Sequence, residues 1–182
     1  MNRLLNLPTT DLTRSRGLTV ILTANKVRAG ITELIANLIL SSPLFVIGGS
    51  EWLPAFDLPR LVRRKTLDVK ATLSRLYTVR TSTCYRMLDS LAHTVSVGEP
   101  ILVLDFLNTF YDADIPYSVR SYKLRKCCDE LNRLAFYRSV IVMTQQMQGE
   151  EYQTFSQILC SAATKTLYLE AEPERVSQPV LF

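Results

Sequence analysis

A run of four aliphatic residues at positions 101–104, ILVL, constrains the fold more than any other feature of the sequence. A strand that is apolar at every position has to be covered on both faces, as happens when helices pack on the two sides of a parallel sheet. Residues 18–23, LTVILT, and 139–144, SVIVMT, are also mostly apolar and carry only Thr or Ser among their polar residues. The three runs therefore predict the central strands of a parallel sheet.

Shorter strands and helices alternate with these runs. Further strands are predicted at 44–47 and 76–79, and helices at 31–40, 84–95 and 118–137, with one or two short helices within 57–76. Near the end, 166–170 and 175–181 flank Glu172-Pro173-Glu174 in the pattern of a β-hairpin. The order predicts an α/β fold with a mostly parallel central sheet, helices on both faces and a C-terminal antiparallel hairpin.

The length and composition indicate one globular domain. A chain of 182 residues is enough for one core, and we expect an N-terminal arm at 1–16 followed by a single domain at 17–182. With 47% hydrophobic and 21% charged residues, the chain is not of the disordered class. A net charge of +4 and a pI near 8.9 permit an acidic partner such as nucleic acid without requiring one.

The cysteines and the N-terminal sequence indicate an intracellular protein. The four cysteines form no C-x-x-C pair, and the single histidine, His93, has no cysteine at metal-ligand spacing. We expect reduced, mostly buried thiols in a reducing cytosol. The first residues lack the apolar core of a signal peptide, and no apolar run reaches the length of a membrane span. These features predict a soluble cytoplasmic protein, or a nuclear one in a eukaryote, with no membrane contact.

The segment after the first strand partly matches a phosphate loop. In the pattern G-x-x-x-x-G-K-[ST], backbone N–H groups hold the phosphates, the lysine neutralises them and the hydroxyl binds magnesium. Residues 25–32 read NKVRAGIT, so Gly30 and Thr32 match, while Asn25 replaces the first glycine and Ile31 replaces the lysine. An ordinary strand–loop–helix connection is the alternative interpretation.

Other polar residues follow the remaining strands, where ligands of parallel sheets bind. Asp105 could hold magnesium, Glu51 could orient an attacking water and Gln146 could sense a γ-phosphate. Each residue also has a structural alternative. Asp105 could cap the next turn, Glu51 could be a loop residue that faces solvent, and Gln146 could bond to backbone groups at the strand end.

In this order the segments resemble the RecA/RadA recombinase family, including its shorter paralogues and RadB-like members, over residues 17–182. GLTVI at 17–21 is similar to the family's glycine-led first strand, and LSRLYTVR at 73–80 to its helix and following strand. Residues 101–105 resemble the Walker B strand, and 140–146, VIVMTQQ, the strand ending in T-N-Q. Tyr168, Arg175 and Val176 fall where the family has its closing strands. The family's acidic turn reads Gly48-Gly49-Ser50-Glu51, with the acid missing or displaced.

The resemblance implies a RecA-like fold with a degenerate nucleotide site. The nucleotide-binding residues would be Asn25, Lys26, Arg28, Gly30 and Thr32, with Thr32 and Asp105 on magnesium if ATP binds at all, and Glu51 and Gln146 as the candidates for catalysis. Without the lysine, the resemblance implies a pseudo-ATPase or weak nucleotide binder, with ATP and Mg²⁺ or no cofactor.

The function implied is that of an accessory or paralogue protein in DNA recombination and repair. Its partners would be another RecA-like subunit or recombination protein and possible single-stranded DNA. The DNA would contact a basic group that consists of Arg60, Arg63, Arg64 and Lys65, with Lys70 nearby. The alternative interpretation of this basic group is a helix face exposed to solvent. Two other functions stay open: an active ATP-dependent enzyme in which Lys26 or Arg28 supplies the charge, and a purely structural subunit of a larger complex.

Overall fold

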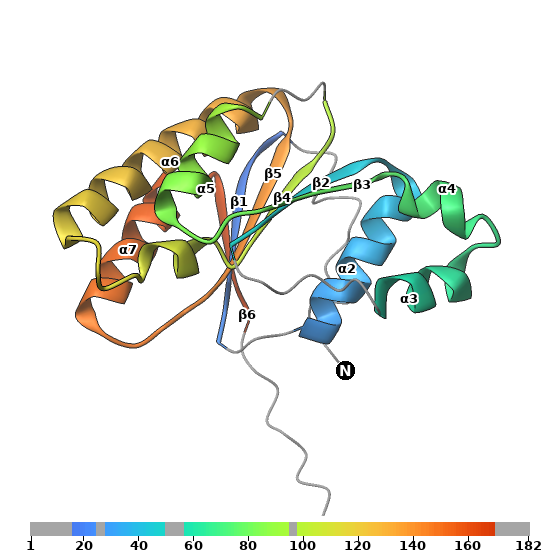
Figure 1. The fold of residues 1–182 in the computed structure, drawn as a ribbon, viewed down its shortest axis with the longest axis horizontal. Helices are drawn as coiled ribbons and strands as arrows, with labels where there is room; N and C mark the ends of the chain where they lie inside the picture. Colours follow the sequence, from blue (N-terminus) through green and yellow to red (C-terminus); the bar gives the residue numbers. More distant parts are fainter. Residues whose placement is uncertain (1–15, 25–27, 50–56, 95–97, 170–182) are drawn as a thin grey trace, which may run out of the picture.

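The structure, a computed structural model, describes residues 16–24, 28–49, 57–94 and 98–169. Six strands form one sheet in the order β3-β2-β4-β5-β1-β6, and all neighbouring strands are parallel (Figure 1). Their bounds are β1 Gly17–Thr23, β2 Leu44–Gly48, β3 Leu76–Arg80, β4 Ile101–Leu104, β5 Ser139–Gln145 and β6 Lys165–Leu169. The predicted α/β architecture with a parallel sheet is confirmed.

Helices cover both faces of this sheet (Figure 1). One face carries α2 Arg28–Ser41, α3 Asp57–Lys65 and α4 Val69–Leu73, and the other carries α5 Cys84–Ala92, α6 Tyr117–Tyr137 and α7 Glu150–Ala162. A short 3₁₀ helix, η2 Phe106–Phe110, follows β4. The chain moves across the sheet toward β3 and then reverses toward β6. Because parallel crossovers are right-handed, this reversal places the later helices on the opposite face.

The central strands alternate between two apolar clusters. In β4, Ile101 and Val103 belong to the cluster beneath α5–α7, whereas Leu102 and Leu104 belong to the cluster beneath α2–α4. All four side chains are buried. Successive residues of a strand point to opposite faces, so a strand covered on both sides has no position for a solvated side chain. This explains the uninterrupted apolar run in the sequence.

Two helix predictions need correction. The first helix begins at Arg28 rather than at Ile31, and the helix predicted at 84–95 ends at Ala92, where the N–H of His93 bonds back to the helix. The helix α7 was not predicted at all. Its core-facing pattern is sparse, because Phe155 and Leu159 are its buried large apolar residues while polar residues occupy a second face.

The last described strand is parallel, which differs from the predicted hairpin. β6 pairs with β1 along residues 19–23 in the same direction, because α7 returns the chain to the end of the sheet where β1 begins. The second predicted hairpin strand, 175–181, lies outside the described residues, as do residues 1–15 of the predicted arm. The hairpin is therefore not confirmed.

Two further observations concern cysteines and helix length. The four cysteines are free, and Cys84, Cys127 and Cys128 are buried, as predicted. Within the described ranges, no helix combines the length and the apolar character needed to cross a membrane.

Candidate functional site

The candidate site lies at the carboxyl ends of the strands. Leu104 of β4 pairs in register with Gly48 of β2 and Met143 of β5, and Gln145 pairs with Thr23 of β1. Neighbouring strands are about 4.8 Å apart, so β4 and β1, on either side of β5, are about 10 Å apart. The exit of β1 and Asp105 therefore lie on the same edge of the sheet.

Backbone hydrogen bonds continue beyond the strand ends. Gln146 N donates to Thr23 O at 2.9 Å, and Ala24 N donates to Leu169 O at 3.1 Å. The exit of β1 is thereby held between β5 and β6. Gln146 is exposed and sits directly beside this exit, which is where a residue that senses a ligand of the first loop would have to be.

Asp105 has an unusual backbone conformation. With φ 51° and ψ 37° it is in the left-handed region, the one non-glycine residue with positive φ in the described part of the chain. Its carbonyl accepts a hydrogen bond from Asn108 N at 3.1 Å, which starts η2. Aspartate tolerates this region better than most residues, and such strain is concentrated at functional sites.

Gly49 allows the exits of β2 and β4 to touch. Gly49 N donates to Leu104 O at 2.7 Å, and a Cβ at position 49 would lie 2.3 Å from the carbonyl oxygen of Asp105. No side chain fits at that distance from backbone. The glycine therefore fixes the backbone of Asp105 against the end of β2.

The connection between β1 and α2 is shorter than the predicted phosphate loop. Because α2 starts at Arg28, only residues 24–27 separate it from Thr23. Gly30 and Thr32 are buried, and Thr32 is 3% exposed. Ile31, at the position of the missing lysine, is half-buried and packs against the apolar cluster beneath α2. An apolar contact thus occupies the position at which a working loop carries its charge.

Not every predicted site residue can be placed. Asn25, Lys26 and Glu51 lie outside the described residues, and Arg28 is the first residue of α2. Among the described residues, no group of three or more histidine, cysteine, aspartate or glutamate side chains is placed to hold a metal. Thr32 carries a hydroxyl and Asp105 a carboxylate, and each is an oxygen group of the kind that Mg²⁺ takes as a ligand.

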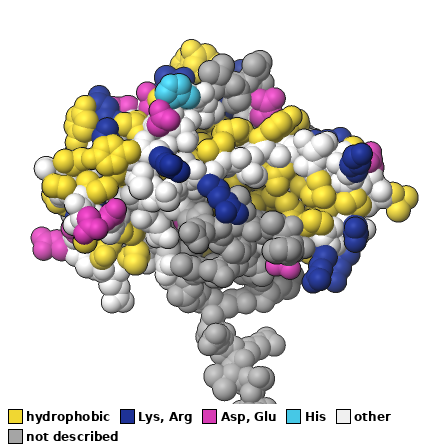
Figure 2. Space-filling model, viewed as in Figure 1, with side chains coloured by type: hydrophobic (Ala, Val, Ile, Leu, Met, Phe, Trp, Pro, Cys, Tyr) yellow, Lys and Arg dark blue, Asp and Glu magenta, His cyan; other side chains and the backbone are white. Residues whose placement is uncertain are grey.

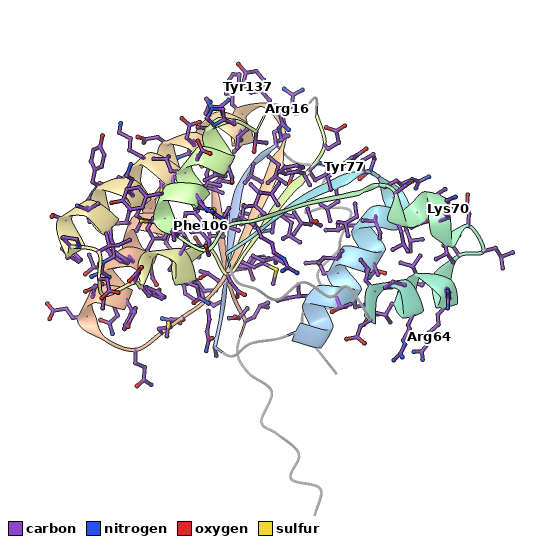
Figure 3. The ribbon with its side chains drawn as sticks, viewed as in Figure 1. Arg16, Arg64, Lys70, Tyr77, Phe106 and Tyr137 are labelled. Carbon is purple, nitrogen blue, oxygen red and sulfur yellow. The ribbon has the colours of Figure 1, made fainter. Side chains whose placement is uncertain are left out.

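The predicted basic group lies on the outer side of α3. Arg60, Arg63 and Arg64 are exposed, whereas Leu58 and Val62 of the same helix are buried. Lys65 pairs with Glu33 of α2 at 3.6 Å. Figure 2 shows Lys and Arg side chains on this side of the molecule, and in Figure 3 Arg64 points outward from α3. The group is therefore accessible to a partner.

A second candidate site, which the sequence analysis missed except for Gln146, lies on the opposite face beneath α7. A cavity of about 300 Å³ is lined by Leu22, Gln146, Gln153, Ser156, Gln157, Cys160 and Tyr168. Four of these residues, 153, 156, 157 and 160, recur at helical spacing and form one stripe of α7. This polar stripe is the sequence signal that could have located the cavity.

The described part of the chain is an α/β protein with a six-stranded parallel sheet flanked by helices, an arrangement consistent with a Rossmann-like or phosphate-loop-like fold. No protein-family model matches the chain, and no curated protein matches its sequence.

Proposed function

We propose that the chain is a RecA-like pseudo-ATPase that acts as an accessory or paralogue subunit in DNA recombination and repair. The fold is compatible with this function, since a strand, a short connection and a helix precede a buried strand that ends in Asp105. Gln146 stands beside the exit of β1. Their order along the chain supports the proposal, because the family it resembles has its phosphate loop, its Walker B aspartate and its T-N-Q strand in the same order.

The observation that carries the proposal is the packing of Ile31. Phosphoryl transfer depends on positive charge that is fixed in advance around the migrating phosphate. At the position where a phosphate loop supplies a lysine, this chain buries part of an isoleucine against the cluster beneath α2. The early start of α2 also shortens the loop available to wrap phosphates. Both features favour weak nucleotide binding without turnover.

An accessory subunit needs surfaces for partners, and α3 offers one. Arg60, Arg63 and Arg64 are exposed on its outer side, and Lys65 is tied to Glu33. Arginines grouped in this way suit the phosphates of single-stranded DNA or an acidic protein surface. In this proposal, a lysine-bearing RecA-like partner supplies the ATPase activity.

The test is ATP turnover by the purified full chain and by Asp105→Asn. Asparagine keeps the left-handed backbone accessible but removes the charge. We expect both proteins to release phosphate at the rate of the buffer blank. Robust turnover that disappears in Asp105→Asn would show an active enzyme and end the pseudo-ATPase proposal.

The position of Arg28 at the start of α2 favours one rival, an active enzyme with an atypical loop. A nucleotide titration of Arg28→Ala and Lys26→Ala separates the two, because only the rival requires a marked loss of affinity. A purely structural subunit is separated by binding of single-stranded DNA, whose affinity falls steeply with salt when phosphate contacts release counterions.

A further inference from the structure

The strand β3 forms one edge of the sheet. It pairs with β2 on one side, and no other strand of the described residues pairs with it on the other (Figure 1). Tyr77, Thr78 and Arg80 are exposed along this strand, and Tyr77 is labelled in Figure 3. An open edge presents a row of backbone N–H and C=O groups that match those of another strand. The outer side of β3 is therefore a surface for backbone pairing.

The bonds between β2 and β3 show which backbone groups point to this open side. Leu44 N donates to Arg75 O at 2.9 Å, and Thr81 N donates to Gly48 O at 2.8 Å. Successive peptide groups of a strand point to opposite sides, so the two bonds mark the odd-numbered residues of β3 as those that face β2. The residues whose N–H and C=O groups point outward are the alternate ones, Leu76, Thr78 and Arg80.

β3 lacks the features by which exposed edges commonly avoid pairing. Its sequence, LYTVR, has no proline and no lysine, and its single charged residue, Arg80, is the last one. Tyr77, at 55% exposure, places a large aromatic ring beside the open side. The opposite edge strand, β6, begins with an exposed Lys165 instead. This contrast favours β3 as the edge that takes a partner strand.

A second copy of β3 fits this edge in the antiparallel direction. In an antiparallel pair, residues that lie opposite each other at alternate positions exchange both of their backbone hydrogen bonds. When Thr78 lies opposite the partner's Thr78, Leu76 lies opposite the partner's Arg80. Every outward N–H and C=O group of the strand then has a partner, on both copies.

The side chains on the face that carries α5–α7 support the same register. Tyr77 and Val79 lie on that face, because Phe45 and Ile47, which are beside them in β2, pack in its apolar cluster. In the symmetric register each Tyr77 lies opposite the partner's Val79. An aromatic side chain opposite a β-branched one is a favourable cross-strand pair. The pairing also covers part of the exposed tyrosine ring.

The charge of β3 excludes the neighbouring registers. With Thr78 at the centre, the two copies of Arg80 are four residues apart along the strands, roughly 13 Å, which exceeds the Debye length of about 8 Å. A centre at Val79 halves that separation and leaves the outward groups of Leu76 unpaired within the strand. A centre at Tyr77 leaves those of Arg80 unpaired. The strand is therefore complementary to its own copy about Thr78.

From this match, we propose that the chain forms a symmetric dimer in which β3 pairs with β3 of a second copy across a two-fold axis at Thr78. The two sheets become one continuous sheet, antiparallel at the junction. The contact of two five-residue strands is small, so the dimer is reversible and depends on protein concentration. The dimer goes beyond the proposed function and requires no nucleotide.

Sedimentation equilibrium of the full chain over a range of concentrations tests the proposal. We expect a monomer–dimer equilibrium that is weakened about tenfold or more in Thr78→Lys and in Thr78→Glu, because each places like charges directly opposite each other. Thr78 is exposed, so the urea midpoint of a single chain should change little. An equimolar mixture of the two variants should restore the dimer, since lysine then faces glutamate.

Asn132→Lys is the matched control for the added charge. Asn132 is exposed on α6, on an element that does not pair with β3, and the substitution adds the same charge as Thr78→Lys. This variant should dimerise with the affinity of the unchanged chain.

Three outcomes would overturn the proposal. A chain that stays monomeric at every concentration would leave the edge to water or to a strand of a different protein. Equal dimer affinities for Thr78→Lys and Asn132→Lys would place the contact elsewhere. A mixture of Thr78→Lys and Thr78→Glu that fails to associate would exclude the register centred on Thr78. ATP turnover, by contrast, would contradict only the pseudo-ATPase assignment.

Discussion

The connections that leave β1 and β5 start side by side but differ in chemistry. Gln146 N bonds to Thr23 O, so the two exits are adjacent, yet one leads to α2 and the other to α7 on the opposite face. At the start of α2, Ile31 packs against the apolar cluster, whereas Gln153 and Gln157 of α7 line a cavity. The position of the missing lysine is therefore occupied by an apolar side chain on one face, whereas glutamine side chains line the hollow on the other.

The substitution Gly49→Ala tests whether the α2 side of this edge depends on one backbone contact. The added Cβ would meet backbone atoms of Asp105 and Leu104 at 2.3 to 3.0 Å, and backbone cannot give way as a flexible side chain can. We expect a loss of about 3 kcal/mol of unfolding free energy, measured by urea denaturation.

Gly98→Ala is the control for that change. Gly98 has φ +91°, and a methyl group on its Cα would meet no atom of the described residues within 4 Å, so alanine adds backbone strain without a clash. We expect a cost of about 1 kcal/mol. Equal costs for the two glycine substitutions would show that the contact between Gly49 and Asp105 is not the limiting feature.

The substitution Arg120→Met tests how α7 is held in place. Arg120 is 7% exposed, pairs with Glu151 of α7, and donates to the carbonyls of Ile115 at 2.8 Å and Phe110 at 3.0 Å. Methionine keeps much of the volume but leaves these acceptors unpaired. Because Glu151 is partly exposed, we expect a moderate loss of about 2 kcal/mol of unfolding free energy, measured by urea denaturation.

Lys126→Met provides the matched control on the same helix. Lys126 forms an exposed pair with Asp129, three residues away, at 3.6 Å. Exposed pairs contribute about 0–1 kcal/mol, so the urea midpoint should shift little. If the two substitutions cost the same, the buried pair does not anchor α7.

The smallest expected effect concerns the reactivity of the cysteine thiols, which differs between the buried core and the cavity beneath α7. Burial raises the pKa of Cys128 to about 12 and also raises the pKa of Cys127 and Cys84, which depletes the reactive thiolate at mildly alkaline pH. Burial likewise raises the pKa of Cys160, but this thiol lines an open cavity. Thiol counting in native protein should detect at most Cys160, and urea should release all four. Rapid native modification of Cys128 would contradict the buried core.

Much of the fold was predictable because the strongest apolar patterns in the sequence fit only one kind of secondary structure. The apolar run at 101–104 and the helical spacing around Leu124 and Leu131 gave β4 and α6 with bounds within a residue. The start of α2 was missed because Gly30, a poor helix former, interrupts its first turn, although Arg28 and Ala29 before it favour a helix. The helix α7 was missed because it divides its inner surface between Phe155 on the core and Ser156 in the cavity, so its apolar period is incomplete.

The sequence alone determined a parallel α/β sheet, because strands that are apolar at every position require cover on both faces. It also determined that Ile31 cannot act as a phosphate-loop lysine. Only the tertiary structure decided where polar groups converge. The neighbours of a strand end depend on the strand order and on the face of the sheet to which each connection turns. The local spacing of apolar residues in the sequence specifies neither of these. That is why Gln146 beside Thr23, Gly49 against Asp105 and the cavity beneath α7 came from the fold.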